Sequence, residues 1–193
     1  LCMPTHFYLL RHAESAFDPS IPEPDWLLSE EGERQAQSLV PTLVALGVNG
    51  CVSSPYIRAV RTVKPFAVHS GLEIVEDAGL RERKLSPEVI PNWLEILHKA
   101  WSDFDFALPG AETSRQCQER MVASVSTWLA KEPEKTLVFS SHGNAIALFL
   151  NAMDPKVGFE EWKGLRNPDV IRVAWKEGEF VGWKRVSLEE QEV

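Results

Sequence analysis

The sequence is short of cysteine and has no long apolar run. Its three cysteines are too few for a disulfide framework, and Cys51 and Cys117 fall within patterns typical of buried elements. No stretch approaches the roughly 18 apolar residues that a membrane-spanning helix needs. An apolar segment begins within a few residues of the amino terminus, so we expect no signal peptide. These features favour a reduced, cytoplasmic protein.

Positive charge is also scarce. Lys and Arg number 20 against 28 Asp and Glu, which gives a formal net charge of −8. Such a surface repels nucleic acid and anionic membranes, so we expect neither as a partner. The histidines and carboxylates show no compact ligand spacing such as His-Glu-x-x-His, so we expect no metal and no other cofactor.

The length of 193 residues suits one domain. The sequence is compatible with a monomer or a homodimer.

Short apolar runs that alternate with helical patterns predict the fold. The runs predict buried strands at residues 6–10, 51–54, 72–75 and 136–140, followed by a hairpin over 170–183 around Glu177 and Gly178. Because helices lie between most of these strands, we predict an α/β fold. It is a three-layer sandwich with a mostly parallel central sheet, helices on both faces and a small helical cap insertion. The single domain spans residues 1–193, with the cap over about 84–112.

Capping residues and prolines predict several helix ends. Ser29 is typical of an N-cap, and Thr113 begins a Thr-x-x-Gln capping box. Pro41 predicts a kink or an early end of the helix that follows Ser29. Pro55 is expected to open a helix, and Ser86-Pro87-Glu88 is expected to start another.

Two histidines stand at the carboxyl ends of predicted strands, where ligands bind in such sheets. Arg11-His12 ends the first strand, and His142 follows the strand at 136–140. An arginine supplies a forked, permanently charged donor that matches phosphate oxygens. A histidine beside it can attack phosphorus through one ring nitrogen if the other is fixed by a hydrogen bond. His142, at a helix start, can donate to a phosphoryl oxygen. Each histidine alone is also compatible with a purely structural position.

Two further charged positions fit the same chemistry. Arg58 lies one turn into the helix after residues 51–54, where a helix start attracts anions, and Arg61 lies one turn further along. Glu82 stands between Arg81 and Arg83 and suits a general acid that protonates a leaving alkoxide. The alternative interpretation is that these arginines are solvated and that the cluster around Glu82 is exposed.

These segments together resemble the histidine phosphatase superfamily, also called the phosphoglycerate-mutase-like family. Leu9-Leu10-Arg11-His12-Ala13-Glu14-Ser15 is similar to the family's amino-terminal signature. Further segments resemble the family's other motifs, in the same order along the chain. Residues 29–36 resemble the intervening helix start, residues 53–62 the Ser-Ser-Pro-x-x-Arg-Ala-x-x-Thr segment and residues 80–82 the segment that carries the acid. Residues 109–113 resemble the Gly-Glu-Ser/Thr segment, one residue out of register, and residues 139–143 the second-histidine motif.

The resemblance implies a phosphomonoester hydrolase of the histidine acid phosphatase type that acts on a small-molecule phosphate ester. It implies that His12 is the nucleophile and that a phosphohistidine is hydrolysed by water. Glu82 is then the general acid and afterwards the base. The residues expected to hold the phosphoryl group or contact the substrate are Arg11, Arg58, His142, Ser15 and Asn144.

The chain departs from the family pattern in the first motif and the loop after it. Ala13 replaces the usual glycine, and Asp18 stands where many mutase-like members have a phosphate-binding asparagine. Because an ionised aspartate would repel phosphate, we leave Asp18 out of the site and expect the loop from Ser15 to Leu28 to differ.

Alternatives remain for activity and substrate. A phosphoglycerate mutase would use the same histidine but return the phosphoryl group to a substrate hydroxyl; the short chain and altered loop favour the phosphatase. A non-catalytic phospholigand-binding protein on this fold would be expected to lack His12 or Glu82.

For the substrate, Arg81, Arg83 and Lys84 suit either a second anionic group or solvent. The cap's aromatic residues suit either its core or a substrate ring: Trp93, Trp101, Phe104 and Phe106.

Overall fold

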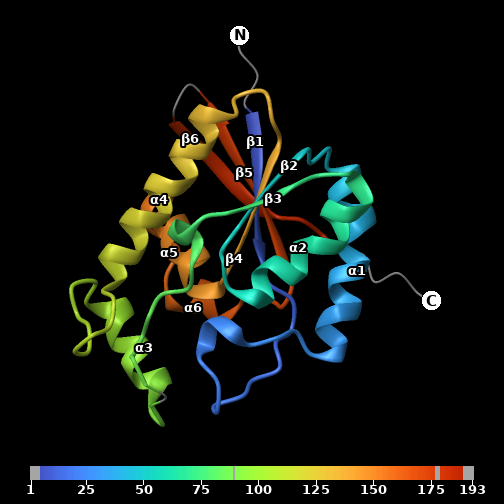
Figure 1. Cartoon of the computed structure of the whole chain (residues 1–193). Coiled ribbons are helices and arrows are strands. Elements are labelled where there is room, and N and C mark those ends of the chain that lie inside the picture. Colours follow the sequence, from blue (N-terminus) through green and yellow to red (C-terminus); the bar gives the residue numbers. More distant parts are fainter. Residues whose placement is uncertain (1–4, 89, 177–178, 189–193) are drawn as a thin grey trace.

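The computed structural model describes residues 5–88, 90–176 and 179–188. These residues form one six-stranded sheet between helical layers, which confirms the predicted α/β class (Figure 1). The strands are β1 (Thr5–Arg11), β2 (Gly50–Ser53), β3 (Ile74–Glu76), β4 (Leu137–Ser141), β5 (Asp169–Lys176) and β6 (Glu179–Arg185). Their order is β3-β2-β4-β1-β5-β6. The sheet is mostly parallel, because three of its five strand pairs are parallel and only β5 runs opposite to the other strands.

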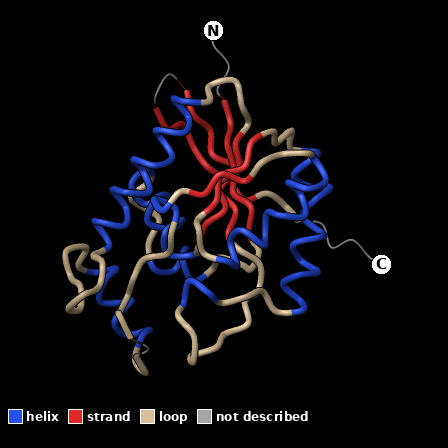
Figure 2. Tube along the Cα trace, viewed as in Figure 1, coloured by secondary structure: helices blue, strands red, loops and turns tan. Residues whose placement is uncertain are grey.

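Helices lie on both sides of the strands (Figure 2). They are α1 (Glu30–Ala45), α2 (Ile57–Ser70), α3 (Trp93–Ser102), α4 (Ser114–Lys131), α5 (Gly143–Met153) and α6 (Phe159–Lys163). Helices α1 and α2 cover one face of the sheet, and α4 and α5 cover the other (Figure 1). The predicted hairpin is formed by β5 and β6, while its turn at Glu177 and Gly178 lies outside the described residues.

The alternation of side chains along β1 explains the three layers. Phe7 and Leu9 belong to the apolar cluster under α4 and α5, whereas Tyr8 and Leu10 belong to the cluster under α1 and α2. Successive side chains of a strand point to opposite faces, so a strand covered on both sides is apolar throughout. Apolar burial of this kind stabilises a fold by about 25 cal/mol per Å² removed from water.

The register of the sheet brings three strand ends together. Arg11 at the end of β1 pairs with Ser141 at the end of β4, and Ser53 at the end of β2 pairs with Ser140. The chain continues this pairing beyond β1, because the His12 N–H donates to the Ser141 carbonyl at 3.1 Å. The segments that follow β1, β2 and β4 therefore meet at one edge of the sheet.

Two of the predicted helix caps are confirmed. The Ser29 hydroxyl accepts a hydrogen bond from the Gly32 N–H at the start of α1, and Thr113 forms a capping box with Gln116 at the start of α4. Gly32 is also required by close packing, because a Cβ at that position would lie 2.0 Å from the carbonyl oxygen of Glu14.

The early helix end at Pro41 and the helix start at Ser86 are wrong, the start predicted at Pro55 lies two residues too early, and a kink at Pro41 stays a prediction. Helix α1 continues past Pro41 to Ala45; Pro41 is exposed, so the carbonyl that loses its partner can turn to water. Helix α2 begins at Ile57, two residues after Pro55. No helix starts at Ser86, where the hydroxyl accepts from the Glu88 N–H at 3.1 Å and closes a local turn instead.

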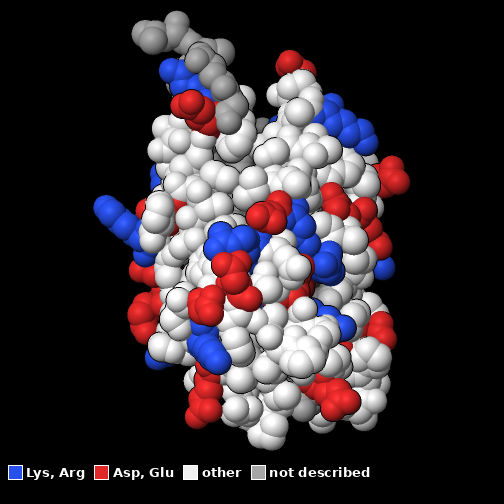
Figure 3. All heavy atoms as spheres, turned by 90° about the vertical axis from the view of Figure 1, so that its left-hand side faces the viewer, with Lys and Arg blue, Asp and Glu red and all other residues white. Residues whose placement is uncertain are grey.

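The segment predicted to form a cap contains α3. Trp101 and Phe104 pack against the main apolar cluster under α4 and α5, so for these two the core interpretation holds. Trp93, by contrast, is 49% exposed. Acidic and basic side chains are interspersed on the face that carries α3 and α4, without a large patch of one sign (Figure 3). Within the described residues, no helix has the length and apolar character to cross a membrane.

Candidate active site

The hydrogen bonds of His12 fix which ring nitrogen is free. Nδ1 lies 2.7 Å from the carbonyl oxygen of Ala13, and Nε2 lies 3.2 Å from Nε of Arg58. Arginine nitrogens only donate, so Nε2 must accept and the proton of the neutral ring must be on Nδ1. Burial, reinforced by the Arg58 charge, lowers the pKa of His12 to about 3. His12 is therefore a neutral imidazole with its lone pair on Nε2.

The backbone around His12 is anchored by distant segments. The Ala13 N–H donates to the Thr62 hydroxyl at 2.9 Å, and the Asn167 side chain donates to the His12 carbonyl at 2.8 Å. Ala13 is fully buried and packs with Leu28 and Ala36. The alanine that replaces the family's usual glycine is thus accommodated by the packing of α1 and the loop before it.

Arg58 is buried beside His12, so the solvated alternative is wrong for this residue, which is 3% exposed. Its guanidinium lies 5.5 Å and 5.1 Å from the ring centroids of Trp26 and Tyr56. Nη1 donates to the Glu23 carbonyl and Nη2 to the Glu23 carboxylate, both at 2.7 Å. Sequence reasoning missed Glu23, because it lies in a proline-rich loop with no periodic pattern. Arg61 remains on the surface.

His142 is completely buried next to His12. The two ring centroids are 5.2 Å apart, and Nε2 of His142 lies 2.8 Å from the hydroxyl of Ser54. Nδ1 is buried and has no hydrogen-bond partner among the described residues. Burial and the charge of Arg58 hold the pKa of His142 well below its ordinary value, so this ring is also neutral.

Arg11 lies against the start of α5. Its Nη1 donates to the Leu165 carbonyl at 2.7 Å, while its buried Nε has no partner within the described part of the chain. A Cβ at Gly143 would lie 3.0 Å from Cζ of Arg11, so the glycine of the second-histidine motif permits this close approach. The Nε–H group of Arg11 is therefore a donor without a partner among the described residues.

Glu82 reaches the same helix start. One carboxylate oxygen accepts from the N–H groups of Arg83 (2.8 Å) and Ala145 (3.0 Å), and the other accepts from the Asn144 N–H (3.2 Å). A helix amino terminus offers unpaired N–H groups and a positive dipole end, which suits a carboxylate. Asn144 is 7% exposed, and its side-chain oxygen has no partner among the described residues.

Arg120 of α4 holds the segment that carries Glu82. It donates to both carboxylate oxygens of Glu112 (2.7 and 2.8 Å) and to the carbonyls of Gly79, Arg81 and Glu82 (2.9, 2.8 and 3.1 Å). Glu112 therefore anchors this irregular segment. Arg120 was missed by sequence reasoning, because one arginine on a helix gives no signal of its partners.

The charged neighbours of Glu82 do not form an exposed cluster. Arg81 pairs with Glu112 at 3.0 Å, and Arg83 is 2% exposed, with Nη2 lying 3.4 Å from the Phe106 carbonyl. Of Arg81, Arg83 and Lys84, only Lys84 is exposed. The solvated interpretation is therefore wrong for Arg83, and Arg81 is tied to the anchor of the loop.

Two residues of the loop after the first motif have local contacts. Ser15 forms an isolated backbone bridge with Leu28, and its hydroxyl makes no hydrogen bond to the other candidate residues within the described chain. Asp18 is exposed and accepts from the N–H and hydroxyl of Ser20 at 2.8 and 2.6 Å, contacts that lower its pKa. The carboxylate that replaces the family's asparagine is thus satisfied locally.

The structure brings six predicted residues to one edge of the sheet, and the contact of Ser15 with substrate stays a prediction. They combine a neutral nucleophilic ring, two guanidinium groups, buried donors and a carboxylate at a helix start: His12, Arg11, Arg58, His142, Asn144 and Glu82. Such a set can hold a phosphoryl group and transfer it, because phosphoryl transfer depends on positioning and charge neutralisation.

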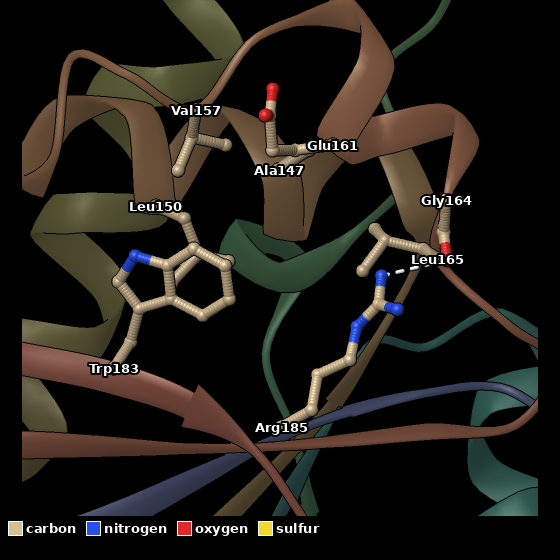
Figure 4. Close-up of a pocket in the computed structure, with 8 residues that line it drawn as sticks. All are labelled: Ala147, Leu150, Val157, Glu161, Gly164, Leu165, Trp183 and Arg185. Atoms are coloured by element: carbon tan, nitrogen blue, oxygen red, sulfur yellow. Dashed lines mark hydrogen bonds between the residues drawn. The ribbon is translucent and has the colours of Figure 1, made fainter.

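A separate hollow of about 340 Å³ lies between α5, α6 and β6 (Figure 4). Its walls are largely apolar, with Leu150, Leu165 and Trp183 among them, and Arg185 donates across it to the Gly164 carbonyl at 2.7 Å. It shares no side chain with the site above. Among the described residues, no group of three or more His, Cys, Asp or Glu is arranged to hold a metal ion.

Comparisons with known proteins point to one superfamily. The family profile of the histidine phosphatase superfamily (branch 1) matches residues 7–186. A probable phosphoglycerate mutase GpmB from Cronobacter sakazakii is 26% identical over 91% of this chain and 88% of its own. The structure of a mycobacterial glucosyl-3-phosphoglycerate phosphatase with inorganic phosphate superposes with a TM-score of 0.76, at 25% identity over 95% of this chain and 96% of that one. A phosphoserine phosphatase mutant from Entamoeba histolytica, in complex with phosphoserine, has the same fold (TM-score 0.76, 19% identity, 97% and 100% coverage).

Proposed function

The chain belongs to the histidine phosphatase superfamily (branch 1), and we propose that it hydrolyses phosphate monoesters through a phosphohistidine formed on His12. The observation that carries this proposal is the state of His12. Its proton is held on Nδ1 by the Ala13 carbonyl, and its lone pair on Nε2 lies among the donors that would bind a phosphoryl group. The substrate is a small-molecule phosphate ester, and the enzyme is a phosphomonoesterase of the histidine acid phosphatase type.

The first half-reaction transfers the phosphoryl group to His12. A phosphoryl oxygen takes over the Arg58 Nε donor, which frees the Nε2 lone pair for in-line attack on phosphorus. As the bond to the leaving oxygen breaks, the ring becomes cationic, and the Ala13 carbonyl stabilises the charge through Nδ1. Arg11 and Arg58 neutralise the charge of the transferring group, and the neutral His142 ring donates a hydrogen bond to it. Glu82 delivers the proton that converts the leaving alkoxide into an alcohol.

The second half-reaction returns the enzyme to its starting state. Water attacks the phosphohistidine, and Glu82, now a carboxylate, accepts the water's proton while the P–N bond breaks. The same group thus carries a proton when the ester binds and takes one from water in the second step. The backbone N–H groups of Asn144 and Ala145 keep the group in place through both steps.

A mutase is the second candidate, because curated relatives such as the Cronobacter protein are named probable phosphoglycerate mutases. A mutase would return the phosphoryl group from His12 to a second hydroxyl of the substrate. The loop between Ser15 and Leu28 favours hydrolysis, because it carries Asp18 in place of the asparagine of many mutase-like members and sets the Glu23 carboxylate against Arg58.

Rapid-quench labelling tests the proposal. With a phosphate ester labelled in the phosphoryl group, we expect acid-labile, alkali-stable label on the wild-type chain and none on His12→Ala. The same samples are then assayed for inorganic phosphate and, with 3-phosphoglycerate, for 2-phosphoglycerate. Label on a serine or aspartate would refute the phosphohistidine. Isomerisation without phosphate release would favour the mutase, and tight binding of esters without turnover would favour a binding protein.

A further inference from the structure

Glu23 places a carboxylate on the arginine that would hold the phosphoryl group. We propose that Glu23 determines specificity by selecting phosphate esters that carry a positively charged group, such as an ammonium, close to the phosphoryl group. The inference rests on the proposed function, because it names the substrate class of the same site.

The position of Glu23 is fixed by its backbone. It begins a 3₁₀ helix, Glu23–Asp25, closed by the Trp26 N–H donating to the Glu23 carbonyl at 3.3 Å, and that carbonyl also accepts from Arg58. One carboxylate oxygen accepts from Arg58 Nη2, whereas the other accepts no hydrogen bond from the described residues. The side chain is 37% exposed. Glu23 thus faces the guanidinium with one oxygen and keeps the other for a ligand.

The surroundings of Glu23 also favour a cation. Burial and the nearby Glu82 raise the pKa of Glu23 against the opposing effect of Arg58, so its carboxylate depends on a positive partner. When phosphoryl oxygens accept hydrogen bonds from Arg58, Glu23 must share this arginine with them. The faces of Trp26 and Tyr56 that border this place already hold the guanidinium of Arg58. An ammonium group on the substrate would instead pair with the free carboxylate oxygen of Glu23.

The test compares two esters of nearly equal shape, 2-aminoethyl phosphate and 2-hydroxyethyl phosphate. For the wild-type chain we expect kcat/KM to favour the ammonium ester by about 10- to 100-fold, the range of one charged hydrogen bond. Glu23→Gln keeps the size and a hydrogen-bonding oxygen but removes the charge, so it should abolish the preference. Asp25→Asn is the matched control: Asp25 is an exposed acid of the same 3₁₀ helix, and it should leave the preference unchanged.

Two results would overturn the inference. One is a wild-type chain that does not distinguish the esters. The other is a Glu23→Gln variant that gains equally on both, because Glu23 would then only compete with phosphate for Arg58. Binding of both esters to His12→Ala, measured by calorimetry, separates this inference from the proposed function. If no ester is hydrolysed but the ammonium ester still binds more tightly in a Glu23-dependent way, the function fails and the specificity stands; equal binding refutes the specificity.

Discussion

Replacing Arg120 by alanine should both destabilise the protein and weaken its acid catalysis. Arg120 is 14% exposed and Glu112 is 11% exposed, and the arginine also serves three backbone carbonyls of the segment before α3. Removing one partner of such a buried pair typically costs about 3 to 5 kcal/mol. Arg81 still pairs with Glu112 in the variant, so we expect the lower end, about 3 kcal/mol.

This loss converts into a measurable shift of the thermal midpoint. A chain of this size loses roughly 2 to 4 °C of Tm per kcal/mol, so Arg120→Ala should melt about 6 to 12 °C lower. Arg120→Lys keeps the positive charge but loses the forked donor geometry of the guanidinium, so we expect an intermediate decrease in Tm. Arg115→Ala is the matched control on the same helix, because Arg115 pairs with Asp105 at the surface (52% and 68% exposed). That exposed pair is worth about 1 kcal/mol or less.

The activity of the same variants separates positioning from stability alone. Well below both midpoints, Arg120→Ala should lose at least about ten-fold in kcat on an alkyl phosphate, because a displaced Glu82 delivers its proton poorly. The loss on p-nitrophenyl phosphate should be much smaller, since that leaving group hardly needs a proton. Calorimetry or circular dichroism gives Tm, and phosphate release gives kcat. A midpoint equal to that of Arg115→Ala, or equal losses on both esters, would refute the reasoning.

Three further predictions follow from the site. Arg58→Ala should lower kcat/KM by about 10² to 10³, the usual loss of one preorganised donor, and near-normal kinetics would show that the phosphoryl group binds elsewhere. Glu82→Gln should lower kcat strongly on alkyl phosphates and weakly on p-nitrophenyl phosphate; equal losses would remove Glu82 as the acid. The pKa of His12 is about 3 in the folded chain against an ordinary 6.5, so the unfolded chain binds more protons between these values and stability falls as the pH drops below about 6.5. Tm should therefore decline from pH 6.5 to pH 4, and less steeply in His12→Gln; identical pH profiles would contradict the buried neutral imidazole.

The sequence by itself determined the sheet and the residues that come to its edge. The run at residues 6–10 is apolar at successive positions from Phe7 to Leu10, which is typical of a short strand buried on both faces. His12 and His142 each follow such a strand, and the carboxyl ends of parallel strands meet at one edge. Ser29 and Thr113 marked helix starts because a cap is a local interaction between neighbouring residues.

Only the tertiary structure decided the partners of these residues. Glu23 meets Arg58 across 35 positions of sequence, and Arg120 meets the Glu82 carbonyl across 38. The tautomer of His12 depends on a contact with Arg58, 46 positions away. Local propensity cannot encode such contacts, because the direction of a side chain in a loop is set by the packing of distant segments around it. The arrangement of charged groups around the candidate nucleophile is therefore set only by the tertiary structure. The substrate preference that we expect depends on this arrangement.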